Sequence, residues 1–392
     1  MGSESKVADQ VNMPEELTNQ LVLVIDSVIS CLTMRLRFAW LLGSRGENYV
    51  EPNGIWARVS LEEFERWMIK HERTYPNNSE KERRFGIFRT RFESIELFNT
   101  QQEGKTSSFK KGINMFSDMT AEEFLSIYAS CQNDDPSKYI SSFGVDSTYD
   151  VAEDDYADIP PVSIDWRDEN LVTPVKNQGQ CGSCWAFAAV AAVEGSMAWN
   201  YGINTSLSEQ QILDCSGNAD GCKGGFTVAA FDYVIRNGGL NSEENYGYVA
   251  KQGTCDSSKT DEHLGRITGY KKVPPNEYDL AKAVAWQPIP VSISIGAGFQ
   301  EYQGGILRGG CSYNPYKNKH TVLIVGYGRT EDHHEDYWIV KNSWGEDWGE
   351  EGYVRMYKGV NLCNIADNAI SPLNTYDVER RKTITRNRRA VG

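Results

Sequence analysis

The chain has 392 residues, of which 40% are hydrophobic, enough for two or three domains with a sizeable core. It carries 40 Lys and Arg residues against 54 Asp and Glu, a formal net charge of −14 at pH 7, which argues against nucleic acid as the main partner. The 10 Trp and 20 Tyr residues are typical of a folded chain rather than a disordered one.

Residues 1–57 show no steady helical or strand periodicity. The first 20 residues are polar, and the apolar stretch 21–32 contains Asp26 and has no basic flank before it. Neither this stretch nor the run 34–42 has the form of a convincing signal peptide, and neither is long enough to span a bilayer. We interpret residues 1–57 as an atypical N-terminal segment, and our hypothesis is that it is an altered signal region.

Two amphipathic helices are expected next. Leu61, Phe64, Trp67 and Met68 recur at steps of three and four, which places them on one apolar face. Ser60 precedes this run with the spacing of a capping box. A second helical face follows Pro76, formed by Glu80, Arg84, Ile87, Phe88, Arg91, Ile95 and Asn99. Spacing alone assigns no function to these helices.

The rest of the chain changes from linker composition to helices and then to strands. Residues 131–158 are rich in Asp, Ser, Gly and Tyr, which indicates an accessible linker. A short helix is expected over 207–215 with Ser208 as its cap, and strands over 290–295, 321–326, 337–340 and 352–356. Helices followed by strands predict an α+β chain with two sub-domains. The last residues, 375–392, form a charged tail.

Nine cysteines occur, and seven of them lie between positions 181 and 363: 181, 184, 215, 222, 255, 311 and 363. Setting Cys184 aside leaves six in this region, an even number that is compatible with three disulfides, although spacing alone does not choose the pairing. Cys181 and Cys184 have no second pair at zinc spacing, so the metal interpretation is weak. Disulfides indicate an oxidising compartment on the secretory route.

Cys184 is the best candidate nucleophile. It stands just before an alanine-rich run that predicts a buried helix, and the positive end of a helix dipole favours the thiolate. Gly179 and Gly182 permit tight turns and close approach of a substrate. Gln178 lies six residues earlier, where its side-chain amide and the backbone N–H of Cys184 can form an oxyanion hole. The alternative for Gln178 is a solvated loop residue.

A cysteine nucleophile needs a base and a group that orients the base. The chain has five histidines; His71, His263, His333 and His334 lie in helical or polar segments, and His320 alone precedes an apolar strand. Asn342 follows another strand, and its amide oxygen can fix the imidazole tautomer, with Trp344 shielding that bond from water. Taken singly, a histidine at a strand edge and an asparagine in a turn are more often structural.

Several motifs resemble those of one family. The segment 178–187 is similar to the local signature of papain and the cathepsins, and 341–345 is similar to that family's Asn-Ser-Trp-Gly motif. His320 also lies at roughly the 130–150 residues from the cysteine that the papain group shows. The segment 80–99 resembles the Glu-Arg-Phe-Asn-Ile-Asn pattern of inhibitory propeptides, except that Arg91 stands where that pattern has Asn, and 112–118 fits the second propeptide motif. The chain resembles the precursor of a plant-type papain-like cysteine protease.

This resemblance implies a fold, a domain order and an activity. The fold is a two-lobed α+β domain, with a helical lobe and a β-barrel-like lobe, preceded by a mainly helical inhibitory prodomain. The expected order is a prodomain at 58–140, an activation linker at 141–158, a peptidase domain at 159–374 and the tail. The expected activity is peptide-bond hydrolysis through a Cys184 thiolate and His320 imidazolium pair and a thioester acyl-enzyme, inhibited by the prodomain until cleavage.

The resemblance also assigns pairings, subsites and partners. It implies the disulfides Cys181–Cys222, Cys215–Cys255 and Cys311–Cys363. The residues that it places at the substrate are Gly224, Gly225, Phe226, Ser294, Thr321 and Asn368. It implies no metal or organic cofactor, and the partners are protein or peptide substrates, the chain's own prodomain and cystatin-like inhibitors, acting on a monomer. The expected location of the protein is a vacuole, a lysosome or the extracellular space. Asn77 and Asn204 each begin a glycosylation sequon.

One position departs from the family pattern, and two other functions stay open. Lys319 occupies a place where relatives usually carry Asp or Asn, and a cation there should disfavour the imidazolium of His320. Lys319 therefore supports one alternative, a pseudo-protease that acts as a binding or storage protein. The other alternative is an inhibitor whose residues 60–140 act on other proteases. Self-shortening, with Cys184→Ala as the control, separates these functions.

Overall fold

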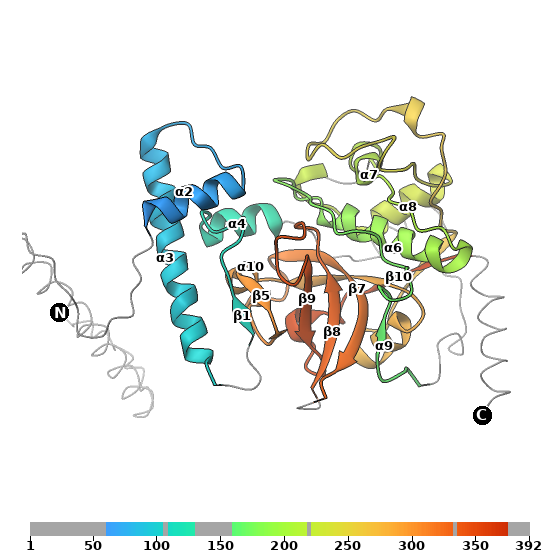
Figure 1. Cartoon of the computed structure of the whole chain (residues 1–392). Helices are drawn as coiled ribbons and strands as arrows, with labels where there is room; N and C mark the ends of the chain where they lie inside the picture. Colours follow the sequence, from blue (N-terminus) through green and yellow to red (C-terminus); the bar gives the residue numbers. More distant parts are fainter. Residues whose placement is uncertain (1–59, 105–108, 130–158, 218–220, 332–334, 375–392) are drawn as a thin grey trace, which may run out of the picture. The chain divides into compact units, whose positions relative to one another are not determined.

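The structure, a computed structural model, describes residues 60–104, 109–129, 159–217, 221–331 and 335–374 (Figure 1). The expectations for residues 1–57, for the linker and for the tail lie outside these residues, as do His333 and His334. Among the described helices, none is long and apolar enough to cross a membrane.

The N-terminal segment, residues 60–129, begins with the predicted helix pair, α2 (Leu61–Lys70) and α3 (Asn78–Gln102). The capping box is confirmed: Ser60 N donates to Glu63 Oε2 at 2.7 Å, and Glu63 N donates to Ser60 Oγ at 3.2 Å. Phe64, Trp67 and Phe88 form a small core between the helices. Leu61, the first residue of α2, was expected on the same apolar face but is 49% exposed.

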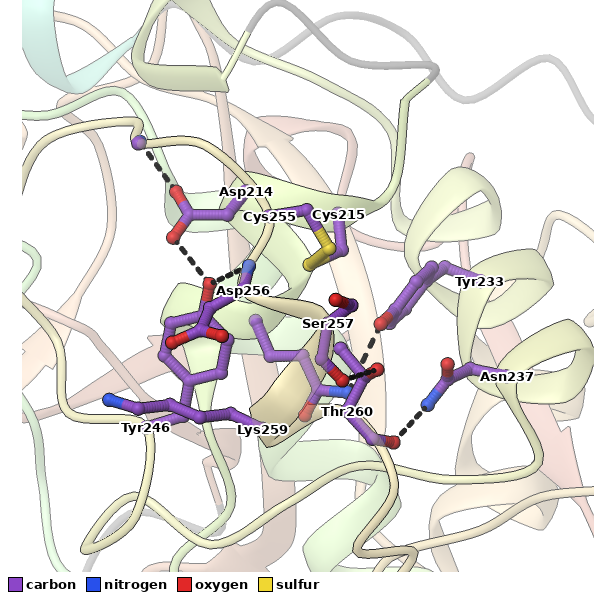
Figure 2. Close-up of a disulfide and its surroundings, with 12 residues drawn as sticks. Asp214, Cys215, Tyr233, Asn237, Tyr246, Cys255, Asp256, Ser257, Lys259 and Thr260 are labelled. Carbon is purple, nitrogen blue, oxygen red and sulfur yellow. Dashed lines mark hydrogen bonds between the residues drawn. A yellow bond between two sulfur atoms is a disulfide. The ribbon is translucent and has the colours of Figure 1, made fainter.

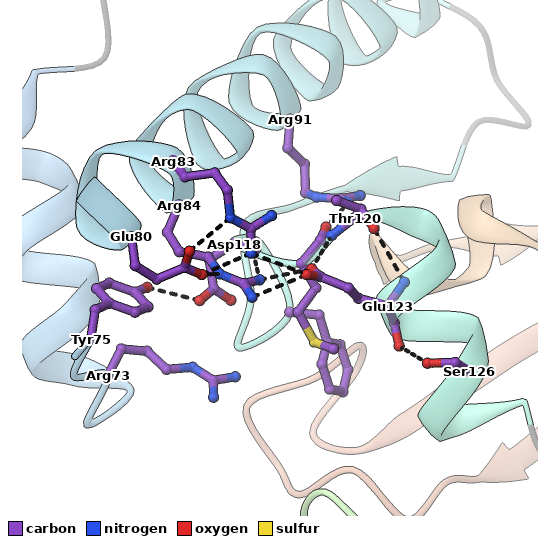
Figure 3. A network of polar contacts seen from close by, with 12 residues as sticks. Arg73, Tyr75, Glu80, Arg83, Arg84, Arg91, Asp118, Thr120, Glu123 and Ser126 are labelled. Atoms are coloured by element: carbon purple, nitrogen blue, oxygen red, sulfur yellow. Dashed lines mark hydrogen bonds and ion pairs between the residues drawn. The ribbon is translucent and has the colours of Figure 1, made fainter. Parts of the chain in front are cut away.

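A polar network joins α3 to α4 (Ala121–Tyr128), as Figure 3 shows. Arg84 donates to Glu80 one turn earlier at 2.7 Å, to Glu123 on α4 at 2.7 Å and to the carbonyl of Asp118 at 2.8 Å. Glu123 also closes a capping box with Thr120 at the start of α4. The Glu80 and Arg84 positions therefore orient α4 through charge-assisted hydrogen bonds.

The main domain, residues 159–374, begins with a helical part. Its helices are α6 (Cys184–Tyr201), α7 (Glu209–Cys215) and α8 (Thr227–Asn237), with 3-10 turns at Gly221–Lys223 and Ser257–Lys259. Ser208 caps α7 as predicted, accepting from Gln211 N at 2.9 Å. α6 is buried on nearly all sides because it packs against both α8 and strand β7, so its alanines permit close approach.

The strands of the second part form one six-stranded sheet. The strand order is β2-β7-β8-β9-β6, and β4 also pairs with β7. The bounds of the strands are β2 (Ile164–Asp165), β4 (Ile289–Ser294), β6 (Ile306–Leu307), β7 (Lys319–Arg329), β8 (Asp336–Lys341) and β9 (Tyr353–Tyr357). The four predicted strands correspond to β4, β7, β8 and β9. Among the described residues the sheet is open rather than a closed barrel, because the strands at its two ends do not pair.

Shorter elements complete the domain. They are the two-stranded sheets β1–β5 (Lys110–Lys111 with Tyr302–Gly304) and β3–β10 (Gly269–Lys272 with Ile370–Leu373), the helices α9 (Glu277–Val284) and α10 (Ala297–Gln300), and a 3-10 turn at Leu362–Asn364. One hydrophobic core surrounds α6–α8 and a second lies among the sheet and α9, which confirms the predicted α+β chain with two sub-domains. The second core includes Phe116, Phe124 and Tyr128 of the N-terminal segment.

Three disulfides have the pairing that the family resemblance implies: Cys181–Cys222, Cys215–Cys255 and Cys311–Cys363. Figure 2 shows the second of them at the end of α7. Beside it, Tyr246 donates to Asp214 at 2.9 Å and accepts from the backbone N–H of Asp256 at 3.2 Å. The bridge and these bonds hold the loop that follows Tyr246 against α7.

Candidate active site

Cys184 is the first residue of α6 and is fully buried. The cap residue, Ser183, makes no side-chain bond to the helix, so no hydroxyl satisfies the first N–H groups of α6. The turn before the helix is fixed by the Cys181–Cys222 bridge and by Gly182 N, which donates to Cys222 O at 2.8 Å. The sequence therefore places this sulfur at a rigid helix N-terminus, where the dipole favours an anion.

The sulfur of Cys184 is itself in a disulfide in this structure. A thiolate at this position therefore requires reduction of that bond first.

His320 is the second residue of β7, and Asn342 directly follows β8, the neighbouring strand. The Nε2 of His320 lies 2.8 Å from Oδ1 of Asn342, and both side chains are buried. Asn342 Oδ1 also accepts from the N–H of Ser343 at 2.8 Å, which fixes the amide. Because Nε2 is held by Asn342, Nδ1 is the ring nitrogen left for proton exchange on the other side.

Trp344 covers the pair from one side. Its ring stacks on the His320 ring with centroids 4.7 Å apart and an interplanar angle of 25°. Trp344 is fully buried among aromatic rings of the main domain, Phe299 and Trp348. This packing covers one face of the His320 ring, and the shielding of the bond to Asn342 from water stays a prediction.

Burial lowers the pKa of His320 to about 4, while the bond to Asn342 and the backbone of Tyr128 on α4 act in the opposite direction. The ring is therefore neutral in this structure at neutral pH. Lys319 directly precedes His320 on β7, and the effect of its charge on the imidazole stays a prediction. Burial also lowers the pKa of Lys319 itself, against the nearby Asp367, and Lys319 is in no ion pair with another described residue.

Gln178 is fully buried beside the same segment. Its Nε2 donates to Cys181 O at 2.8 Å, and its Oε1 accepts from the hydroxyl of Ser343 at 2.6 Å. Its backbone N–H donates to Ser343 O at 2.9 Å. These bonds orient the amide group with its NH2 toward the turn that leads into Cys184. The second N–H of Nε2 is the donor that an oxyanion would use.

The papain family cysteine protease model matches residues 160–373, more than half of the chain, and the cathepsin propeptide inhibitor domain (I29) matches residues 64–124. The chain belongs to the papain family of cysteine proteases.

Individual relatives are similar in sequence to this chain over most of its length. It is 42% identical to the senescence-specific cysteine protease SAG12 of Arabidopsis thaliana over 316 residues, 78% of this chain and 88% of that one. It is 42% identical to fruit bromelain of Ananas comosus over 328 residues, 82% of this chain and 88% of that one. The structure of a recombinant stem bromelain precursor superposes with a TM-score of 0.68 at 41% identity, covering 80% of this chain and 98% of that chain.

The expected substrate-binding residues form two groups within the peptidase domain. Gly224 and Gly225 are buried before α8, and Gly224 has a φ of +111°, which only glycine adopts without strain; Phe226 is the cap residue of that helix. Ser294 and Thr321 lie on the paired strands β4 and β7, and Asn368 accepts from Ser292 N at 3.0 Å. Ser294, Thr321 and Asn368 therefore share one side of the domain, and the other three residues lie near Cys184 and the Cys181–Cys222 bridge.

The inhibitor domain lies directly against this site. Three aromatic rings from the N-terminal segment pack edge-on around Trp344: Phe116 at 5.2 Å, Phe124 at 5.4 Å and Tyr128 at 5.7 Å between centroids. The backbone of Tyr128 also interacts with the His320 ring. The last turn of α4 thus lies against the histidine and the tryptophan that stacks on it.

Sequence reasoning missed a buried charged cluster behind the site. Lys176 bonds to Glu194 at 3.1 Å and to Glu209 at 2.8 Å, and Lys341 donates to Thr173 O at 2.8 Å. Burial lowers the pKa of Lys341 to about 8 and raises that of Glu209. Two sequence signals existed: Glu194 interrupts an apolar helix, and Lys341 ends a strand directly before Asn342. Across the described residues, no group of three or more His, Cys, Asp and Glu side chains could hold a metal ion.

Proposed function

We propose that the chain is the zymogen of a cysteine endopeptidase in which Cys184 is the nucleophile and His320 the acid–base group. The observation that carries this assignment is the 2.8 Å contact between His320 and Asn342 under Trp344. The histidine lies on the strand that packs against the helix beginning at Cys184. No other described histidine is held in this way at a strand end.

The first chemical step is attack on a peptide carbonyl. Once its disulfide is reduced, Cys184 is favoured as a thiolate by the N-terminus of α6, and a neighbouring thiolate in turn favours the protonated form of His320. The sulfur forms a bond to the carbonyl carbon, and the carbonyl oxygen becomes an oxyanion. Gln178 Nε2 and the N–H of Cys184 donate to that oxygen.

The remaining steps transfer protons through His320. Nδ1 gives its proton to the leaving amine as the peptide C–N bond breaks, which leaves a thioester on Cys184. The neutral ring then takes a proton from a water molecule that attacks the thioester and releases the acid. Asn342 keeps Nε2 protonated throughout, so that the same ring nitrogen serves both steps.

The prodomain inhibits this chemistry by occupying the site. This is supported by the aromatic contacts of α4 with Trp344 and by the backbone of Tyr128 beside His320. Cleavage within residues 141–158 would separate the prodomain, 58–140, from the peptidase domain, 159–374. The disulfides fit a secretory-route protein of a vacuole, lysosome or extracellular space, with cystatin-like inhibitors as further partners.

The subsites follow the two groups of residues described above. Gly224 and Gly225 expose backbone that pairs with an extended substrate, as in strand addition. Phe226, Ser294, Thr321 and Asn368 line the main specificity pocket. Ser294 and Asn368 bring polar groups to it, so the pocket accepts more than bulky apolar side chains.

Self-processing of the full chain tests this function. After reduction at mildly acidic pH, the chain should shorten itself near residue 155, and a thiol-directed epoxide should label Cys184 in equal amount. Cys184→Ala should abolish both results while leaving the fold unchanged. A reduced chain that folds, binds peptides and never shortens or reacts would instead favour the pseudo-protease, whose specific support is the buried Lys319 next to His320.

A further inference from the structure

A single carboxylate of the peptidase domain, Glu301, is held by two cations of the prodomain. Arg91 Nη1 on α3 lies 2.5 Å from Glu301 Oε1, and Lys111 Nζ on β1 lies 2.9 Å from Oε2. All three side chains are largely buried, with exposed fractions of 11% for Arg91 and Glu301 and 16% for Lys111. Each carboxylate oxygen therefore has its own cation in a place that is mostly closed to water.

Each cation is also held by contacts within the prodomain. Arg91 Nη2 also donates to the carbonyl of Met119 at 2.5 Å. The backbone of Lys111 is clamped by Asn99, whose amide donates to Lys111 O at 2.8 Å and accepts from Lys111 N at 3.1 Å, and Lys111 Nζ lies 4.6 Å from the centroid of the Phe98 ring. Such anchoring lowers the entropy lost on forming the contact.

The contacts around Glu301 are of a different kind. Gly112 N donates to Glu301 O at 2.8 Å, Asn114 Nδ2 donates to Gln300 O at 2.7 Å, and β1 pairs with β5. These bonds use the backbone of the peptidase domain, so they do not depend on which side chain stands at position 301. Only the contacts of Arg91 and Lys111 depend on which side chain stands at position 301.

We propose that Arg91 and Lys111 make the prodomain selective for a peptidase that presents a carboxylate at the position of Glu301. A neutral or basic side chain there would leave two neighbouring cations buried without a counter-charge, and that penalty rejects the wrong partner. Arg91 stands where the propeptide pattern has Asn, so this pair is a feature of this chain. The inference rests on the proposed function only in naming the peptidase domain as the partner.

The test uses the full chain carrying Cys184→Ala, so its result does not depend on catalysis. Amide hydrogen exchange is followed in two segments, residues 110–114 at the contact and residues 336–341 in β8 as a check on folding. Exchange at 110–114 should rise at least about tenfold in Glu301→Gln and Arg91→Met, and further in Glu301→Lys. In Glu301→Asp, which keeps the negative charge, exchange at 110–114 should stay closer to that of the parent.

Lys70 provides the matched control. It reaches Asp347 of the peptidase domain at 3.5 Å across the same interface, but the two side chains are 61% and 55% exposed. Lys70→Met should change exchange less than about twofold, because exposed ion pairs contribute little. In the double variant Arg91→Met/Glu301→Gln, the two effects should be clearly less than additive.

Three outcomes would overturn the proposal. The first is an Arg91→Met effect no larger than that of Lys70→Met, and the second is additive effects of Arg91→Met and Glu301→Gln. The third is equal exchange in Glu301→Asp, Glu301→Gln and Glu301→Lys. If Glu301→Lys also raises exchange in β8, that variant has disturbed the fold and is set aside. The comparison of Arg91→Met and Lys111→Met with Lys70→Met then decides whether the buried cations matter more than the exposed one. Self-shortening of the unmodified chain reports on the proposed function separately.

Discussion

The Nε2 of His320 and the Oδ1 of Asn342 lie 2.8 Å apart although 22 residues separate them in sequence. Register explains the contact, because β7 and β8 are antiparallel neighbours that pair Leu323 with Lys341. His320 near the start of one strand and Asn342 just past the end of the other are thereby brought to the same edge of the sheet.

Removing the Asn342 amide should weaken catalysis without unfolding the domain. In the mature enzyme, Asn342→Ala deletes one buried hydrogen bond to His320, worth about 1–3 kcal/mol, so kcat/KM should fall about 5- to 150-fold. Asn342→Asp keeps an acceptor oxygen and should retain more activity than the alanine variant. Equal kcat/KM for Asn342→Ala and the parent would remove Asn342 from the mechanism.

The oxyanion role of Gln178 predicts a larger loss in kcat than in substrate binding. Gln178→Ala should lower kcat about 10²- to 10³-fold with a small change in KM, because the donor acts on charge that develops in the transition state. Gln180→Ala, an exposed residue of the same loop, serves as the control and should remain within about twofold. A loss confined to KM would assign Gln178 to substrate binding instead.

The parts of this site that could be predicted are those with a strong local signal. His320, Asn342 and Cys184 each stand next to an apolar strand or helix, and the apolar run marks where that element begins or ends. Long-range pairing carries no such signal: Arg91 and Glu301 are 210 residues apart, and either residue alone is an ordinary surface charge. The order of the strands in the sheet was also beyond sequence reasoning, which predicted four of the six strands and took the β-barrel-like form of the lobe from the family resemblance alone.

Acid should destabilise the zymogen through His320. Its pKa is about 4 in the folded chain against 6.5 for the unfolded one, so between these values the unfolded state binds the extra proton. Stability therefore falls as the pH is lowered from about 6.5 to about 4, through this group. In the Cys184→Ala full chain, adding His320→Gln should flatten the decline of the melting temperature over this range.

The control for that measurement is His263, which is exposed. His263→Gln should leave the pH dependence of the melting temperature as it is in the parent. An identical slope in the His320→Gln variant and the parent would show that other groups cause the acid response.

The disulfide at Cys184 predicts a zymogen that needs a reductant as well as acid. A sulfur in a disulfide cannot ionise to a thiolate, so an alkylating reagent should not react with Cys184 in the untreated full chain. A small dithiol should open the bond, giving up two hydrogens as it closes to its own disulfide and leaving Cys184 and its partner as thiols. Labelling of Cys184, followed by mass spectrometry, and proteolytic activity should then appear together. Full labelling of Cys184 in the untreated parent chain would show that the nucleophile is free in the zymogen and that acid alone activates it.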